Sequence, residues 1–323
     1  MANVAANLAD KHSLDALVET TKAAGDRLRA QILRALATES YSVSELCQIF
    51  AIAQPAMSHH LKVLSTAQLV AKRREGNSFY YRRATAQRDT LHHALFDAID
   101  QAVLPRAVGD GVARVHADRH QRSADFFAQN AHRFADQQAL VAQASTYAGA
   151  VAEVIDNAGA TPGKLLEVGP GTAELLDVLA TRFDEVVGID SSPTMLKQTA
   201  ERTAEFANVT LREQDFFAVP TSRRYDAVVA AMVVHHMPSP QRFFKQAHRI
   251  IKVGGLLVVA ELCRHDNDWV TKACGDTWLG FEPQELEAWA AKAGFTPTES
   301  QFLGQNNGFQ IQIHGFRRNR QRT

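Results

Sequence analysis

The C-terminal half of the chain contains the stretch KLLEVGPGTA at residues 164–173, and this stretch decides the fold of that half. Its first five residues form a short, mainly apolar run, which is typical of a buried parallel strand. Gly169 and Gly171 follow at once, and glycine lets the backbone turn sharply and approach a ligand closely. A strand, a glycine turn and then a helix after Thr172 are typical of a nucleotide-binding sheet.

The rest of this half continues the alternation of strands and helices. Candidate parallel strands lie at residues 164–168, 185–190, 209–214, 225–231 and 256–261, with helices after Thr172, Pro193, Ser239 and Pro283. Residues 298–303 and 309–316 are expected to close the sheet as an antiparallel hairpin. This alternation predicts an α/β doubly wound, Rossmann-like sheet, which binds ligands at the carboxyl ends of its strands.

The residues around the glycine turn indicate the kind of ligand. Asp190 ends the second strand about 20 residues after the turn, where a carboxylate accepts both hydroxyls of a ribose. Pro170 between the glycines, Ala173 at the third glycine position and the acidic Glu167 argue against a pyrophosphate. The pattern therefore favours a ribose-containing ligand other than a dinucleotide.

With Asp215-Phe216 after the third strand and residues 225–229 at the fourth, this region resembles class I S-adenosylmethionine-dependent methyltransferases over residues 145–316. The resemblance implies that the two glycines lie against the methionine part and that Asp190 binds the ribose. It also implies that Met195 lies near the adenine and that Asp215 accepts from the adenine amine. The residues expected to contact S-adenosylmethionine or S-adenosylhomocysteine are Glu167, Gly169, Gly171, Asp190, Ser191, Met195, Asp215 and Phe216. Asp226 is expected to cap a strand end instead.

His235 and His236 follow the fourth strand, where methyltransferases often place groups that face the substrate. Histidine is suited to act as a base near neutral pH, yet the same pair occurs in relatives with no chemistry assigned to it. The catalytic residue therefore stays open, with His235 and His236 as candidates. Residues 263–281 are expected to form a lid over the pocket, and Phe126-Phe127 to pack on this domain or to cover its ligand.

The N-terminal segment reads as a set of amphipathic helices. The SVSE run that begins at Ser42 has the form of a capping box, and residues 54–64 form a helix whose apolar side chains point inward. The outer face of this helix carries Gln54, Ser58 and Lys62, with His59 beside them. Polar side chains on the exposed face of a helix that follows a tight turn predict a reader of the DNA major groove.

Residues 69–82 read as two strands around a turn at Gly76-Asn77, with basic flanks that include Arg73 and Arg74. Residues 53–88 contain seven basic residues, the last of them Arg88, against one acidic residue. Such an excess is typical of contact with DNA phosphates, although a solvated basic face has the same composition. The sequence therefore predicts a winged helix-turn-helix with Arg73 and Arg74 at the phosphate backbone.

The run MSHHLKVLSTAQLVAKRREGNSFYYRR resembles the ArsR/SmtB family of winged-helix repressors, over residues 13–104. The resemblance implies a homodimer, formed by helices near 14–21 and 91–103, on a two-fold symmetric operator. Metal sensing is a third interpretation, weakened because Ser42 and Ser44 stand where arsenic and cadmium sensors carry Cys-x-Cys. The spacing of Asp89, His92, His93, Asp97 and Asp100 does not match the family's metal site, so we expect no metal. Ala53 replaces the usual serine N-cap of the reading helix.

Composition limits the remaining possibilities. The chain has 323 residues, with 35 basic and 35 acidic side chains and three cysteines, which excludes a uniformly basic coat and a disulfide scaffold. No apolar run approaches the roughly 18 residues that span a bilayer, and the first residues lack the order of a signal peptide. We therefore expect a cytoplasmic protein without a membrane partner.

The sequence predicts three parts. Residues 1–104 form an α+β winged helix-turn-helix domain for DNA binding and dimerisation, 105–144 a helical linker with a hinge at 105–111, and 145–323 the methyltransferase-like domain. The order of the domains resembles repressors that respond to S-adenosylhomocysteine. This implies a transcriptional regulator with an adenosyl effector, and the alternative is an active small-molecule methyltransferase that controls its own gene.

Overall fold

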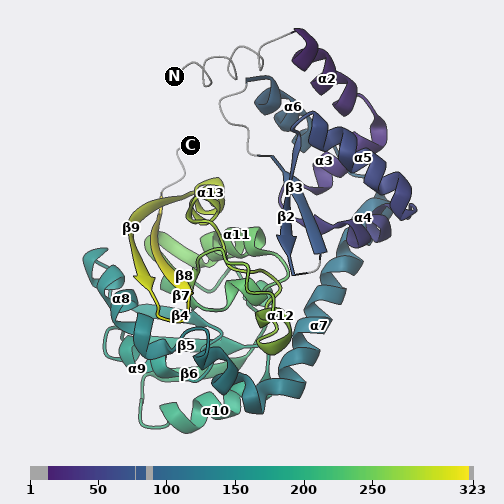
Figure 1. Ribbon diagram of the computed structural model, residues 1–323. Helices are drawn as coiled ribbons and strands as arrows, with labels where there is room; N and C mark the ends of the chain where they lie inside the picture. The colour runs from purple at the N-terminus through teal and green to yellow at the C-terminus, as the bar shows by residue number, and fades with distance from the viewer. Residues whose placement is uncertain (1–13, 77, 85–89, 320–323) are drawn as a thin grey trace. The chain divides into compact units, whose positions relative to one another are not determined.

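The computed structural model describes residues 14–76, 78–84 and 90–319 (Figure 1). It divides into two compact units, residues 1–119 and 120–323. Asn77, Arg88 and Asp89, which entered the predictions above, lie outside the described residues. Within the described ranges, no helix combines the length and the apolar character needed to cross a membrane.

The first unit is a set of helices with a small antiparallel sheet of order β1-β3-β2. Its elements are α2 (Leu14–Ala24), α3 (Arg27–Ala35), β1 (Tyr41–Ser42), α4 (Val43–Phe50), α5 (Gln54–Thr66), β2 (Val70–Glu75), β3 (Ser78–Arg83) and α6 (Thr90–Gln101), and α7 (Arg106–Ala139) begins here. The order confirms the predicted winged helix-turn-helix. Ser42 caps α4 in a reciprocal capping box with Glu45, whereas Ala53 gives α5 no side-chain cap.

The core of this unit follows the predicted pattern. Met57, Leu61 and Leu64 of α5 are buried, and Cys47 of α4 packs against the same core. The burial of one face of α5 leaves its polar face outward, which places the predicted reading residues on the surface. Val115 of α7 belongs to this core as well.

Helix α7 replaces the predicted hinge. Gly109 and Gly111 lie inside a helix of 34 residues, so the expectation of a hinge at 105–111 is wrong. A Cβ atom on Gly111 would lie 2.6 Å from the carbonyl oxygen of Ile49, so this glycine allows α7 to approach α4 closely. Arg119, the last residue of the first unit, is buried and donates to Glu45 Oε1 at 2.7 Å and Oε2 at 2.8 Å. The helix is therefore anchored in the first unit at both its start and Arg119.

The second unit is built on a seven-stranded sheet of order β6-β5-β4-β7-β8-β10-β9. Its strands are β4 (Lys164–Val168), β5 (Glu185–Asp190), β6 (Val209–Glu213), β7 (Tyr225–Ala231), β8 (Ile251–Leu262), β9 (Phe295–Gly304) and β10 (Gln310–Arg318). Its helices are the rest of α7, α8 (Ala144–Asn157), α9 (Glu174–Ala180), α10 (Pro193–Thr203), α11 (Pro240–Ile250), α12 (Val270–Ala273) and α13 (Pro283–Ala293), with short 3-10 turns η1 (Phe216–Ala218) and η2 (Val234–His236). The first five strands pair in parallel and β10 pairs antiparallel with β8 and β9, which confirms the doubly wound sheet and its terminal hairpin.

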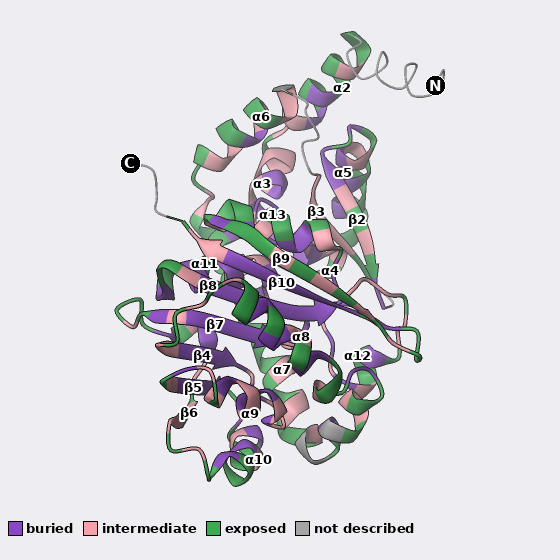
Figure 2. Ribbon diagram, turned by 90° about the vertical axis from the view of Figure 1, so that its left-hand side faces the viewer, coloured by how far each residue is buried: buried purple, intermediate pink, exposed green. Residues whose placement is uncertain are grey.

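Helices cover both faces of this sheet. Helix α8 packs on α9 at one face, and α11 packs on α13 at the other (Figure 1). The inner strands are almost wholly buried, whereas the edge strand β9 alternates between exposed and half-buried residues (Figure 2). The strand order reverses beside β4, because β5 and β6 lie to one side of it and β7 and β8 to the other. Such a reversal opens a crevice at the carboxyl ends of the strands.

Candidate functional site

A cavity of about 450 Å³ lies in this crevice, entirely within the second unit. Its walls come from the ends of β4, β5, β6 and β7 and from the segments that follow them. All eight residues that the sequence predicted as adenosyl contacts line it: Glu167, Gly169, Gly171, Asp190, Ser191, Met195, Asp215 and Phe216. The topology thus brings together residues that are up to 49 positions apart in the sequence.

The glycine turn after β4 forms one wall of the cavity. Gly169 has φ of 66° and Gly171 has φ of 54°, both in the left-handed region that favours glycine. A Cβ atom on Gly169 would lie 2.6 Å from Cγ2 of Val233, so the turn also requires a residue without a side chain at this position. The carbonyl of Gly171 accepts a hydrogen bond from Thr199 Oγ1 at 2.8 Å, which holds the turn against α10.

Asp190 ends β5 at the cavity wall, and its Oδ1 accepts from the backbone N–H of Ser192 at 2.8 Å. Burial raises the pKa of Asp190 to about 6, although the backbone N–H groups of Ser192 and Ser191 oppose this rise. Ser192 in turn caps α10 by accepting from Met195 N at 3.4 Å. One strand end and one helix start therefore place Asp190, Ser191 and Met195 together.

Glu167 lies in β4 and is only 2% exposed. No described residue donates a hydrogen bond to its Oε2. Burial, with a smaller effect of the nearby Asp177, raises the pKa of Glu167 to about 8. A buried carboxyl group at a cavity wall is suited to a ligand that brings a hydrogen-bond donor or a cation.

Asp215 has a structural contact within its own loop, and its contact with the adenine stays a prediction. Its Oδ1 accepts from Phe217 N at 2.9 Å and so caps η1, while the residue also lines the cavity. Asp226, at the opposite end of the sheet, accepts from Lys164 N at 2.8 Å and from Lys252 Nζ at 2.9 Å. The prediction that Asp226 is structural is confirmed.

The second half of α7 and the segment after it complete the cavity wall. They contribute residues that the sequence analysis did not identify, namely His120, Ser123, Phe134, Gln138, Ala139, Ala142, Gln143, Ala144, Ser145 and Tyr147. Phe127 also lines the cavity, as the lid interpretation of Phe126-Phe127 required, and its ring centre lies 5.0 Å from that of Phe134 and 5.2 Å from that of His236. An aromatic wall therefore faces the glycine turn.

The expectation that residues 263–281 form a lid is wrong. These residues are all described, and none of them lines the cavity. Cys263 forms a parallel bridge to Phe281, and the indole N–H of Trp278 donates to Met237 O at 2.9 Å. The segment therefore folds back against the β7–α11 connection, and α7 takes the place expected for it at the cavity.

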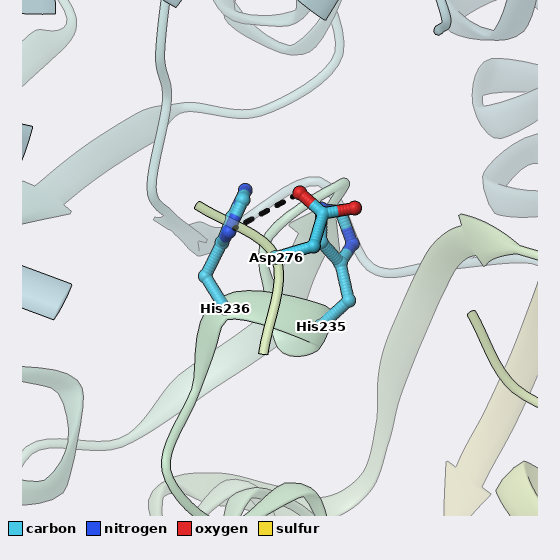
Figure 3. A group of neighbouring side chains, drawn as sticks. All are labelled: His235, His236 and Asp276. Carbon is cyan, nitrogen blue, oxygen red and sulfur yellow. Dashed lines mark ion pairs between the residues drawn. The ribbon is translucent and has the colours of Figure 1, made fainter. Parts of the chain in front are cut away.

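A buried cluster of two histidines and two carboxylates lies beside the cavity. Nδ1 of His235 lies 2.6 Å from Glu261 Oε2, and Glu261 Oε1 accepts from Val234 N at 2.6 Å. Oδ1 of Asp276 lies 3.8 Å both from His235 Nε2 and from His236 Nδ1. Figure 3 shows the Asp276 carboxylate beside the two imidazole rings, with a dashed line to His236. His236 lines the cavity and His235 does not.

These neighbours change the pKa values of the cluster in opposite directions. Burial disfavours the charged form of His235, but Glu261 and Asp276 outweigh it and raise the pKa of His235 to about 9. Burial, followed by the charge of His235, lowers the pKa of His236 well below its usual value. Burial raises the pKa of Asp276 to about 6 against the attraction of His235. In the unliganded protein at neutral pH, His236 is therefore the neutral histidine of the pair.

In the first unit, the predicted DNA-facing residues of α5 share one exposed face. Gln54, Ser58, His59 and Lys62 are all exposed. Their apolar neighbours in the same helix point into the core. An exposed polar face of this kind is what a helix that reads a DNA groove requires. The contact of these four residues with bases stays a prediction.

The wing is only partly as predicted. Arg74 is exposed, and its Nε donates to Gly76 O at 2.8 Å. Arg73 is half-buried and pairs with the buried carboxylate of Glu75. Lys72 is exposed, with its ammonium over the ring of Phe79. Part of the basic excess seen in the sequence is therefore used within the wing.

Two family models match this chain. A model described as a bacterial regulatory protein of the arsR family matches residues 26–72, and a model described as a methyltransferase domain matches residues 166–259. The first range includes α5 and the first half of β2, and the second runs from β4 into β8. The two matches therefore fall on the two units separately.

Curated relatives resemble the second unit. The 2-methyl-6-phytyl-1,4-hydroquinone methyltransferase 2 of Oryza sativa subsp. japonica is 28% identical over 156 residues, 47% of this chain and 44% of that protein. The demethylmenaquinone methyltransferase of Tropheryma whipplei strain Twist is 34% identical over 104 residues, 32% of this chain and 44% of that protein. The chain thus spans less than half the length of these two relatives.

Two solved structures with a similar fold are a methyltransferase and a putative methyltransferase. The 1,6-didemethyltoxoflavin-N1-methyltransferase of Burkholderia thailandensis, with S-adenosylhomocysteine bound, aligns with a TM-score of 0.53 at 15% identity, over 68% of this chain and 93% of that chain. A putative methyltransferase in complex with the Trm112 activator of Haloferax volcanii aligns with a TM-score of 0.51 at 14% identity, over 62% and 99%. At these identities the likeness concerns the fold.

Proposed function

Because this chain carries a bacterial arsR-family regulatory domain followed by a class I methyltransferase domain, we propose that it is an operator-binding transcriptional regulator. Its effector is S-adenosylhomocysteine or S-adenosylmethionine, bound in the cavity of the second unit. Asp190 binds the ribose, Asp215 accepts from the adenine amine, and Glu167 receives a donor or cation from the amino-acid end.

One observation carries this proposal, which is that α7 belongs to both units without a break. Arg119 of this helix is buried against Glu45 in the first unit, and the next residue, His120, lines the cavity of the second. Phe127 and Phe134, further along, form the aromatic wall. A ligand that shifts the second half of α7 therefore acts on a helix that is packed into the core of the reading domain.

The surface of the first unit supports dimeric binding to an operator. Leu14, Leu17 and Val18 of α2 are 74%, 43% and 38% exposed, and Val103 after α6 is 94% exposed. Apolar side chains grouped in this way favour contact with a second copy. A homodimer would present two copies of α5 to the two half-sites of a symmetric operator.

The test measures operator binding by the full chain. A labelled duplex is selected from random DNA by the protein itself, and its affinity is measured with S-adenosylhomocysteine, S-adenosylmethionine or zinc added separately. A coupling of about 1–3 kcal/mol, or roughly 5- to 150-fold in operator affinity, is expected from one adenosyl compound. If neither adenosyl compound changes the affinity, the effector role fails.

A second function is supported by the far wall of the cavity. His236, Phe127 and Phe134 form a surface that the adenosyl contacts do not use, and the curated relatives are small-molecule methyltransferases. On this alternative the chain methylates a small aromatic acceptor and its reading domain controls its own gene. Methyl transfer needs chiefly proximity and a group that takes a proton, and His236 faces the cavity.

The two functions differ in what happens to the methyl group. A regulator binds S-adenosylhomocysteine more tightly than the methyl donor, by about 1–3 kcal/mol for one methyl and its charge, and turns over nothing. An enzyme transfers labelled methyl from S-adenosylmethionine to a panel of hydroquinones. Transfer that His236→Ala abolishes without loss of adenosyl binding would establish the enzyme and reject the purely sensory function.

A further inference from the structure

We propose that His235, His236 and Asp276 form a binding site for a divalent transition-metal ion beside the adenosyl cavity. One ligand atom from each of the three residues lies within 4.8 Å of the others. Two imidazoles with one carboxylate are a ligand set that suits zinc and other divalent ions of the first transition row. The inference goes beyond the proposed function and departs from the expectation of no metal.

The carboxylate of Asp276 gives the strongest support. It is 3% exposed, and neither of its oxygens accepts a hydrogen bond from the described residues. Burial of a carboxylate without hydrogen bonds costs hydration free energy, and a bound cation would offset this cost. Its Oδ1 lies 3.8 Å from a ring nitrogen of both His235 and His236. An ion bound by these three atoms would contact a buried carboxylate that accepts no hydrogen bond from the described residues.

Glu261 prepares His235 for this role. It is fully buried and holds Nδ1 of His235 at 2.6 Å, while its other oxygen accepts from Val233 N at 3.1 Å and Val234 N at 2.6 Å. A histidine whose Nδ1–H donates to a carboxylate presents Nε2 as a metal ligand, in a fixed orientation. Nε2 of His235 is the atom that faces Asp276.

Geometry and charge are compatible with one ion. Ligand atoms on a tetrahedral ion with bonds of about 2.0–2.2 Å lie roughly 3.3–3.6 Å apart, so the 3.8 Å separations from Asp276 have to shorten only slightly. Binding of the ion through Nδ1 of His236 would replace a weak hydrogen-bond contact of 3.3 Å with Gly275 O. The ion has to displace the proton that His235 carries at neutral pH, because the pKa of His235 is about 9 in the metal-free protein. Once this proton has left to solvent, two carboxylates and two neutral imidazoles around a divalent cation sum to zero charge, which favours burial.

The site borders the cavity through one residue. His236 belongs both to the metal group and to the cavity wall, so an ion held there would lie next to whatever occupies the far end of the cavity. In the metal-bound protein His236 is a ligand and not a base. The ion would then be the electrophilic group nearest to a bound molecule.

The experiment titrates zinc and cobalt(II) into the full chain after removal of metals with a chelator, with magnesium as a comparison. We expect about one high-affinity zinc or cobalt ion per chain, visible absorption from the bound cobalt, and no comparable binding of magnesium, which prefers oxygen ligands. Asp276→Asn should weaken zinc binding by about 100-fold or more, and Glu261→Gln by about 10- to 100-fold. Asp266→Asn, an exposed acid in the same segment, is the matched control and should bind as the wild type does.

Thermal melting separates a ligand from a purely structural residue. In chelator, Asp276→Asn should melt close to the wild type, because the lost attraction to His235 is offset by the removal of a buried carboxylate that accepts no hydrogen bond from the described residues. Zinc should raise only the wild-type melting temperature. A lower melting temperature in chelator together with unchanged zinc affinity would overturn the proposal. His236→Gln is the second variant, and S-adenosylhomocysteine binding by each variant verifies its fold. Equal zinc affinity in the wild type and in both variants would also overturn it.

Discussion

Buried carboxylates in the two units of this protein differ in how their hydrogen-bonding capacity is used. Glu45 of the first unit accepts from Arg119 through both oxygens and from Ser42 N at 2.8 Å. Burial works against its charge, but the hydrogen bonds of Arg119 and Ser42 together hold the pKa of Glu45 below its usual value. Glu167 and Asp276 of the second unit are as deeply buried, yet each has at least one oxygen without a partner among the described residues.

The difference distinguishes buried carboxylates that stabilise the fold from buried carboxylates that are available to bind a ligand. A buried ion pair with complete hydrogen bonds is specific to one packing arrangement, whereas an incomplete carboxylate destabilises the fold until something binds to it. In the reading unit the hydrogen-bonding capacity of Glu45 is therefore used within the fold, as is that of Glu261 in the cavity unit, whereas Glu167 and Asp276 each keep an oxygen open for a ligand or an ion. Four measurements test this contrast.

The largest effect on stability is expected for the buried ion pair of Arg119 and Glu45. Arg119→Met should lower the free energy of unfolding of the first unit by about 3–5 kcal/mol, because it leaves Glu45 buried without its main partner. Urea denaturation of the full chain measures this loss. Arg106→Met in the same helix is the control, since that side chain is 96% exposed, and should change little. Similar losses of unfolding free energy in both variants would contradict the idea that the buried Arg119–Glu45 pair stabilises the first unit.

The second effect concerns Asp190, the carboxylate at the end of β5 that lines the cavity. Asp190→Ala should weaken adenosyl binding by about 100-fold, equal to about 3 kcal/mol, and abolish the ligand response while operator affinity stays unchanged. Calorimetry and the operator assay measure the two properties separately. Asp184→Ala, an exposed acid beside the other end of the same strand, is the control. Loss of operator binding in Asp190→Ala would contradict the separation of roles.

The third effect is a pH dependence of the ligand-free protein. Glu167 has a pKa of about 8 in the folded state against about 4.5 in the unfolded chain, so between these values the folded protein holds the extra proton. Its contribution to the free energy of unfolding therefore falls as the pH rises from about 4.5 to about 8. Glu167→Gln should flatten this part of the profile, measured as melting temperature from pH 5 to pH 8. Parallel profiles for the wild type and the variant would refute the assignment.

The smallest effect is expected in the wing, where the contrast between closed and open charges is least sharp. Arg73 pairs with buried Glu75, yet the sequence predicts that it also contacts phosphate. Arg73→Ala should weaken binding to all DNA sequences and reduce the salt slope by about 0.9, whereas Gln54→Ala should relax sequence preference. An unchanged slope in Arg73→Ala would make this arginine a partner of Glu75 alone.

Much of the reading unit could be predicted because its signals are local. The Ser42–Glu45 capping box, the apolar spacing of Met57, Leu61 and Leu64, and the alternation in the hairpin each concern residues a few positions apart. The hinge at 105–111 was wrong for the opposite reason. Gly111 is a glycine because Ile49, 62 positions earlier, lies against it, and no local pattern carries that contact.

The cavity unit divides in the same way. The glycine turn, Asp190 and Asp215 end successive strands, so periodicity and the rule that ligands bind at carboxyl ends were enough to predict where they lie. Phe127, His235 and His236 were named as candidates, whereas Phe134 and the carboxylates Glu261 and Asp276 were missed. Glu261 ends a long apolar strand, which was a usable signal, but nothing local marks Asp276.

The sequence by itself determined the two domain types, the order of the elements and the adenosyl-facing strand ends, because hydrophobic periodicity, caps and glycine turns act over a few residues. Only the tertiary structure decided which buried charges are satisfied. Arg119 meets Glu45 across 74 positions, and Asp276 reaches His235 across 41 without gaining a hydrogen bond. Burial and partnership depend on which distant segments the packed core brings together, and in this protein that packing gives Glu45 its partners and leaves Glu167 and Asp276 without a full set among the described residues.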